Sequence, residues 1–195
     1  MSKKCYRFFG GLLNTQEKWL NKMSEKGYRL VRTGKLLYEF EKCKPDEVTY
    51  CVEFIGEKSK ESSIDYANFL EDMGYKVFFK NINLNDSVGK VRWRPWAERG
   101  GRIATNTTTF NREILIAEKT NDGKPFELHT SYDDKEKYYR NLRNPWLFLL
   151  LMFALFAVTK QSIIFGIFAL VSVIPGSIYQ IQIMKIRKEA KTQEW

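Results

Sequence analysis

A chain of 195 residues with a formal net charge of +9 is long enough for one folded domain and an appendage. Its three cysteines lack CxxC spacing, which excludes a disulfide framework and a cysteine-rich zinc site. The positive charge suits an anionic neighbour, either lipid head groups or nucleic acid, although a solvated basic surface accounts for it equally well.

The first quarter of the chain predicts a β-α-β-β unit. Residues 5–9 form an apolar and aromatic run that a glycine pair interrupts, as expected of a strand. Apolar residues then fall on one helical face up to Gly27, which is suited to end a helix. Residues 28–31 and 36–40 predict the two strands that follow.

The next segment predicts the same plan. Residues 47–55 alternate between apolar and polar side chains, as in a half-buried strand, and residues 59–73 predict a helix that ends at Gly74. Residues 75–79 and 90–94 are the next predicted strands, and a further strand at 114–118 follows an irregular loop.

The two predicted helices end in similar sequences 47 residues apart. We therefore predict an α+β fold in which duplicated β-α-β-β units form an antiparallel sheet with helices on one side. A ferredoxin-like sheet is the competing prediction. Six residues at corresponding positions are the predicted fold-determining residues: Trp19, Gly27, Tyr28, Tyr66, Gly74 and Tyr75.

The C-terminal part divides by composition. Residues 1–120 form the predicted soluble α+β domain, and residues 121–144 a turn and a charged juxtamembrane helix. Residues 146–183 are almost wholly apolar and would extend about 57 Å as one helix. A hydrocarbon core is about 30 Å thick, so two crossings fit this length better than one.

We predict a transmembrane hairpin over residues 145–184, with helices at about 145–158 and 162–184. Pro145 suits the first turn of the first helix, and Pro175 should kink the second without ending it. Small residues such as Gly166 and Gly176 would allow another helix to approach closely. Residues 185–195 form a basic tail.

Basic residues flank the hairpin on both sides, while its turn holds only Lys160. The flanking residues are Lys135, Lys137, Arg140, Arg143, Lys185, Arg187, Lys188 and Lys191. The positive-inside rule then predicts a multi-pass protein of the cell membrane with both termini cytoplasmic. The alternative is a buried helical hairpin of a soluble protein, but a small domain has no core large enough to hide it.

The pattern of aromatic and glycine residues resembles a bacterial family known as domain of unknown function 2812 (DUF2812). The resemblance rests on W-L-N-x-M from Trp19, on Gly27-Tyr28-x-Leu30 and on Gly74-Tyr75. It implies the fold above, C-terminal hydrophobic spans and a PadR-type transcriptional regulator as a frequent gene neighbour. It implies no activity, so no catalytic residue is carried over. Tyrosine stands at 28 and 75 where tryptophan is commoner in the family.

Nothing in the sequence marks an enzyme. The single histidine, His129, lies in a polar stretch typical of a surface. The chain contains neither GxxxxGK[ST] nor GxGxxG, so a phosphate-binding loop is not indicated. We expect no catalytic residue, no metal site and no cofactor.

The segment VRWRPWAERGGR at residues 91–102 is the most unusual one. In a strand, Trp93 would point into the core and the arginines into solvent. Alternatively, the arginines contact an anionic leaflet or ligand with Trp96 at the interface. Stacking on nucleic acid is a weaker alternative, because phosphate binding needs a wider basic surface. The candidate membrane or anionic-ligand contacts are Arg92, Arg94, Trp96, Arg99, Arg102, Arg140, Arg143, Lys185, Arg187 and Lys188.

These features predict a membrane-anchored binding or regulatory protein that senses a ligand or a protein partner at the inner leaflet. The many aromatic residues could line an apolar pocket for a small amphipathic ligand, or could fill the core. The alternative function is a structural accessory subunit of a membrane complex. Membrane lipids and a protein are the expected partners, and nucleic acid is not.

Overall fold

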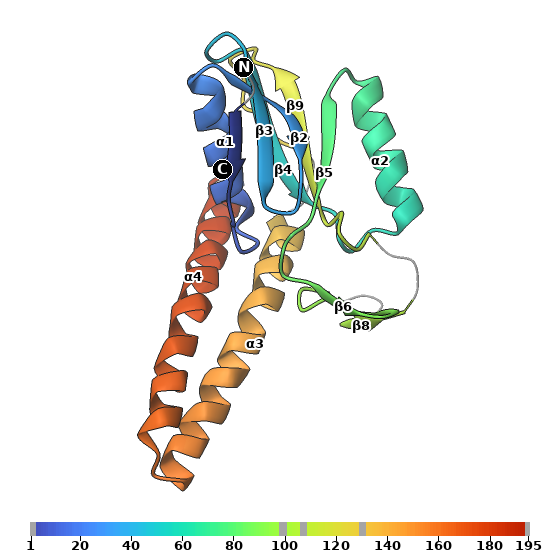
Figure 1. Ribbon diagram of the computed structural model, residues 1–195. Helices are drawn as coiled ribbons and strands as arrows, with labels where there is room; N and C mark the ends of the chain where they lie inside the picture. The colour runs from blue at the N-terminus through green and yellow to red at the C-terminus, as the bar shows by residue number, and fades with distance from the viewer. Residues whose placement is uncertain (1–2, 98–100, 106–108, 129–131, 194–195) are drawn as a thin grey trace. The chain divides into compact units, whose positions relative to one another are not determined.

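The computed structural model describes residues 3–97, 101–105, 109–128 and 132–193, and Figure 1 shows its helices and strands. The chain divides into two compact units, Met1–His129 (unit 1) and Thr130–Trp195 (unit 2). The division falls within residues 121–144, the stretch for which the sequence predicts a turn and a charged helix.

Unit 1 begins with a β-α-β-β repeat. Its elements are β1 (Lys3–Tyr6), α1 (Leu13–Glu25), β2 (Tyr28–Thr33) and β3 (Leu37–Lys42), and the antiparallel sheet has the order β1-β3-β2. Leu20 and Met23 of α1 are buried. Trp19 lies edge-on to Tyr38 and Phe40, at ring-centroid distances of 4.9 and 5.6 Å. These aromatic contacts fix the helix to its sheet.

The second repeat has the same topology. Its elements are β4 (Val48–Phe54), α2 (Lys60–Asp72), β5 (Lys76–Lys80) and β9 (Ile114–Thr120), and its antiparallel sheet has the order β4-β9-β5. The two helices have 13 residues each and begin at Leu13 and Lys60. Below α2 lies an apolar core that includes Cys51, Ala67 and Leu115. The duplication predicted from sequence is therefore present.

The structure corrects the third strand of this repeat. Residues 90–94 were expected there, but β9 occupies that place. An insertion between β5 and β9 forms its own antiparallel sheet of order β6-β7-β8. Its strands are β6 (Asp86–Val88), β7 (Val91–Trp93) and β8 (Ile103–Ala104). The strands of unit 1 thus hydrogen-bond in three small sheets rather than in one.

Helix α1 of the first repeat covers the edge of β4 in the second. Three polar side chains one helical turn apart make the contacts: Glu17, Asn21 and Ser24. The Tyr50 N–H donates to Asn21 Oδ1 at 2.7 Å, and Asn21 Nδ2 donates back to the Tyr50 carbonyl at 3.0 Å. The Val52 N–H donates to Glu17 Oε2 at 2.9 Å, and Ser24 Oγ donates to the Val48 carbonyl. These bonds satisfy backbone groups that an edge strand otherwise leaves open.

A buried polar network also joins the repeats. Glu118 of β9 is 1% exposed and accepts hydrogen bonds from the Tyr50 hydroxyl at 2.8 Å and from Arg29 Nε at 2.7 Å. The Tyr50 hydroxyl in turn accepts from the Leu30 N–H at 2.7 Å. Burial raises the pKa of Tyr50, which keeps the hydroxyl protonated as a donor.

The glycines that follow α1 and α2 occupy matching positions, and they allow a test of the close contact at Gly27. Gly27 and Gly74 both have positive φ, at +74° and +86°. An added Cβ at Gly27 would meet the Cys43 carbonyl oxygen at 3.0 Å, whereas at Gly74 it would meet nothing within 4 Å. We expect Gly74→Ala to cost about 1 kcal/mol from backbone conformation alone, and Gly27→Ala to cost about 2 kcal/mol. Urea unfolding of the detergent-solubilised full chain measures both costs, and equal costs would contradict this contact.

Unit 2 consists of α3 (Tyr132–Thr159) and α4 (Ile163–Gln193), joined by a short turn. Arg187 Nη2 lies 2.7 Å from Glu136 Oε1, and Arg143 Nη1 donates to Gln180 Oε1 at 2.7 Å, so the helices run side by side as a hairpin. Both are long and apolar enough to cross a membrane. Of the apolar stretch in each helix, only 6% is buried in α3 and 22% in α4. These helices are compatible with a membrane association.

The helices are longer than the predicted spans. The charged segment predicted before the membrane is part of α3, so Pro145 lies inside this helix and not in its first turn. Helix α4 continues through Pro175 as expected and includes most of the predicted basic tail. Proline has no backbone N–H, so the helix loses one hydrogen bond at residue 145. A long apolar helix can continue through such a site.

Candidate functional site

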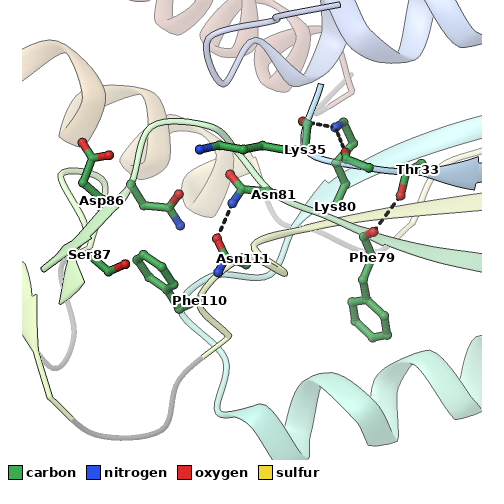
Figure 2. A pocket seen from close by; sticks show the side chains of 11 residues that line it. Thr33, Lys35, Phe79, Lys80, Asn81, Asp86, Ser87, Phe110 and Asn111 are labelled. Carbon is green, nitrogen blue, oxygen red and sulfur yellow. Dashed lines mark hydrogen bonds between the residues drawn. The ribbon is translucent and has the colours of Figure 1, made fainter. Parts of the chain in front are cut away.

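A cavity in unit 1 lies where the two repeats meet the insertion. It has a volume of about 620 Å³ and is formed by the β2–β3 turn, the end of β5, the start of β6 and the segment before β9. Figure 2 shows the side chains around it. Its lining residues are Thr33, Gly34, Lys35, Phe79, Lys80, Asn81, Asn85, Asp86, Ser87, Phe110 and Asn111. We call it the amide pocket, after its three asparagines.

Lys80 holds one wall of the amide pocket in place. Its side chain is 3% exposed, and Nζ donates to the carbonyl oxygens of Gly34 and Lys35, both at 2.7 Å (Figure 2). The same Nζ lies 4.5 Å from the centroid of the Tyr38 ring. Burial lowers the pKa of Lys80 to about 8. Since its hydrogen bonds go to the β2–β3 turn, this amine ties the first repeat to the second.

Behind the amide pocket lies a buried carboxyl group. Glu113 is fully buried and accepts hydrogen bonds from the backbone N–H groups of Ile82 and Asn111 and from Asn85 Nδ2. Asn111 Oδ1 accepts in turn from Asn81 Nδ2, a bond drawn in Figure 2. Burial raises the pKa of Glu113 to about 7, against the opposing effect of these donors.

Asn85 presents an unused acceptor in this network. Its side chain is 8% exposed, and Oδ1 is buried with no hydrogen-bond partner among the described residues. Asn85 uses its NH₂ group for the bond to Glu113 Oε1, and Oδ1 is the atom that the described residues leave without a partner. A buried acceptor without a hydrogen-bond partner is costly.

A second hollow of about 230 Å³ adjoins the amide pocket and shares Phe79 and Phe110 with it. It adds basic groups, Lys60 and Arg112. The Arg112 guanidinium lies 5.7 Å from the Phe79 ring and the Arg92 guanidinium 5.7 Å from the Phe110 ring. An arginine side chain therefore lies next to each of the two phenylalanine rings that the hollows share.

The structure corrects two of the candidate membrane contacts. Arg94 is 5% exposed and its Nη2 donates to the Gly101 carbonyl at 2.8 Å. Trp96 is 1% exposed and lies edge-on to Phe54 at 5.2 Å, so it belongs to the core. Trp93, expected in the core, is 49% exposed. The side chains of β7 alternate as predicted, but the face that carries Val91 and Trp93 is exposed, and Arg92 lies on the face that is turned inward.

The other candidate contacts are placed as follows. Arg92 is half-buried and Arg102 is exposed, whereas Arg99 and the single histidine, His129, lie outside the described residues. In unit 2, Arg140 and Arg187 both pair with Glu136, and Lys185 and Lys188 are exposed on α4.

The predicted fold-determining residues make contacts within unit 1. Beside the packing of Trp19 and the two helix-ending glycines, the Tyr66 hydroxyl donates to Glu53 Oε2 at 2.7 Å. The Tyr75 ring lies 5.1 Å from Phe126, and Lys3 Nζ lies 4.4 Å from the Tyr28 ring.

Sequence reasoning did not identify the residues of the amide pocket. Asn81, Asn83 and Asn85 alternate just after β5, a pattern that is common in ordinary polar loops and does not by itself indicate a pocket. Glu113 gave no signal, because a single carboxylate in a predicted loop is usually solvated. Among the described residues, no cluster of three or more histidine, cysteine or acidic side chains is arranged to hold a metal ion.

Comparison with known proteins identifies one family. The family described as Protein of unknown function (DUF2812) matches residues 13–151. No curated protein and no solved structure matches the chain. The matched stretch begins with α1, includes every residue that lines the amide pocket and ends within α3. It covers more than half of the sequence, and the chain therefore belongs to the DUF2812 family.

Proposed function

We propose that this chain is a membrane-anchored binding protein whose amide pocket takes a small polar ligand. The observation that carries the proposal is the buried Oδ1 atom of Asn85, which lacks a hydrogen-bond partner among the described residues although Asn85 lines a cavity of about 620 Å³. If binding brought a hydrogen-bond donor within reach of this enclosed oxygen, the network would gain the bond that it lacks.

The lining indicates the chemistry of this ligand. Three asparagine amides, Thr33 and Ser87 offer both donors and acceptors, while Phe79 and Phe110 offer ring faces. Such a combination suits a ring compound with hydroxyl or amide groups, such as a sugar or a nucleoside. Lys35 would favour a ligand with an anionic substituent.

This ligand class differs from the amphipathic one that the aromatic content suggested. Several large aromatic side chains, among them Tyr38, Phe40, Tyr50 and Trp96, are fully buried and fill the core of unit 1. They are therefore not available to line a pocket for an apolar ligand. The polar lining supports a polar ligand instead.

In this proposal unit 2 holds the protein in the membrane, and the basic residues at both ends of the hairpin keep unit 1 in the cytoplasm. Ligand binding would then be reported to a protein partner, for which the resemblance suggests a PadR-type regulator. Gly166, where an added Cβ would meet nothing within 4 Å, favours close approach of another transmembrane helix. An accessory subunit of a membrane complex is on this ground the second candidate function.

Thermal unfolding of the full chain in detergent, with a panel of sugars, nucleosides and their phosphates, tests the pocket. Ser87→Trp should fill the cavity from the exposed strand β6, whereas Asn68→Trp places the same side chain on the exposed surface of α2. We expect at least one polar compound to raise the unfolding temperature, and Ser87→Trp to weaken its binding at least about tenfold. No shift with any compound, or a shift that survives Ser87→Trp, would contradict the proposal.

A further inference from the structure

The insertion sheet β6-β7-β8 has two unlike faces. In its antiparallel register Val88 is opposite Val91, and Trp93 is opposite both Asp86 and Ile103, so these five side chains lie on one face. Ser87, Arg92 and Ala104 pair with one another on the other face. We call the first the outer face and the second the inner face.

Apart from Asp86, the outer face is apolar, and it is open to solvent. The exposed fractions are 82% for Val88, 45% for Val91, 49% for Trp93 and 68% for Ile103. Exposed apolar residues scattered singly are ordinary, but here four are neighbours across three short strands. A contiguous apolar patch of this kind indicates a surface that is covered in the working protein.

The inner face fixes the sheet in this orientation. Ser87 lines the amide pocket, the Arg92 guanidinium lies over the Phe110 ring, and Ala104 is buried. Next to the sheet, the Arg94 N–H donates to the Arg102 carbonyl at 2.7 Å, and Trp96 is in the core. Turning the apolar residues inward would break these contacts, so the outer face cannot bury itself.

Basic residues frame the outer face. A two-residue loop of Gly89 and Lys90 joins β6 to β7, and Gly89 has the positive φ of +59° that suits the first position of such a tight hairpin turn. Lys90 at this tip and Arg102 next to β8 are both exposed. Asp86 is the only acidic residue among the described residues 86–93 and 101–105.

We propose that the outer face docks on an anionic lipid surface, the membrane in which the hairpin of unit 2 is anchored. Trp93 would lie among the head groups, where tryptophan is enriched, with Val88 and Ile103 against the acyl chains. Lys90 and Arg102 would attract anionic lipids to the edge of this face. The inference rests on the membrane anchor of the proposed function, since tethering keeps unit 1 close to lipid.

Docking would link the lipid surface to the amide pocket. Ser87 and Val88 are neighbours on β6, one lining the pocket and the other on the outer face. A ligand bound next to Ser87 therefore touches the strand whose opposite side contacts the membrane.

An environment-sensitive fluorophore attached to a cysteine tests the docking in the full chain. Cys5 and Cys43 are replaced by serine and the buried Cys51 is kept. The label is then placed by Val88→Cys on the outer face, by Met73→Cys at the exposed end of α2, or by Phe168→Cys on α4. Each protein is reconstituted into phosphatidylcholine vesicles with or without phosphatidylglycerol, and with lipids that carry a quencher on the acyl chain.

We expect the label at 88 to be quenched severalfold more than the label at 73, with an emission shifted to the blue. The difference should require phosphatidylglycerol and should be lost in Lys90→Glu/Arg102→Glu. Quenching at 168 but equal weak quenching at 88 and 73 would overturn the docking and leave the anchor standing. A blue shift at 88 without quenching would show that protein covers this face, and so overturn the lipid proposal.

Two further outcomes separate the parts of the inference. Absence of quenching at 168 would contradict the membrane anchor itself, and with it the proposed function. Quenching at 88 that does not depend on phosphatidylglycerol would contradict the role of Lys90 and Arg102.

Discussion

Replacing Glu118 with alanine is expected to lower the free energy of unfolding by about 3 kcal/mol. Glu118 is 1% exposed and is the common acceptor for Tyr50 and Arg29, which come from the second and the first repeat. Its loss leaves the Tyr50 hydroxyl without its acceptor inside the protein. The Arg29 side chain is 35% exposed and can still reach water, so its part of the cost is reduced.

Urea unfolding of the detergent-solubilised chain, followed by tryptophan fluorescence, measures this loss. Glu71→Ala, a change on the exposed surface of α2, is the matched control and should cost less than about 0.5 kcal/mol. Glu118→Gln keeps the shape and one acceptor oxygen and should fall between the two. If Glu118→Ala and Glu71→Ala cost the same, the network does not hold the repeats together.

The stability of unit 1 is expected to rise as the pH falls from 8 to 5. Burial raises the pKa of Glu113 from an ordinary value of 4.5 to about 7. Between these two values the folded protein binds a proton that the unfolded chain does not, so acidification favours the folded state. The stabilisation is fully present below the unfolded pKa and is lost as the pH rises through the folded pKa. Over the whole window it amounts to about 3 kcal/mol.

The unfolding midpoint measured at several pH values between 5 and 8 tests the titration of Glu113. Glu113→Gln cannot titrate, and we expect its midpoint to change much less over this range. The lowered pKa of Lys80, about 8, acts mainly above this window, where rising pH favours the folded state. A wild-type midpoint that falls on acidification, or the same profile for Glu113→Gln, would show that Glu113 does not control this dependence.

The sequence predicted the repeat but not which strands complete it. Gly27 and Gly74 marked the helix ends correctly, because a residue with positive φ after a helix is a local requirement that glycine meets. The partner of β4 was missed, because β9 lies far along the chain and nothing in either strand specifies the other. Residues 90–94 were nearer in sequence and were wrongly preferred.

The residues of the amide pocket could not be predicted from local sequence patterns, for a related reason. Lys80, Asn85 and Glu113 lie in separate segments, and each alone is typical of a polar surface. Only the tertiary structure buries them together. Trp93 was misplaced for a simpler reason: alternation predicts which side chains share a face of β7, but not which of the two faces is buried.

Because α1 covers β4, the second repeat depends on the first for the protection of its edge strand. If the second repeat were produced alone, its edge strand β4 would expose unpaired backbone amides and carbonyls. Such an edge can pair with other chains and favours fibrillar self-association. The cover comes from α1 of the first repeat, so β4 is protected only when the two repeats fold together. This dependence favours cooperative folding of the two β-α-β-β repeats, even though their sequences have diverged.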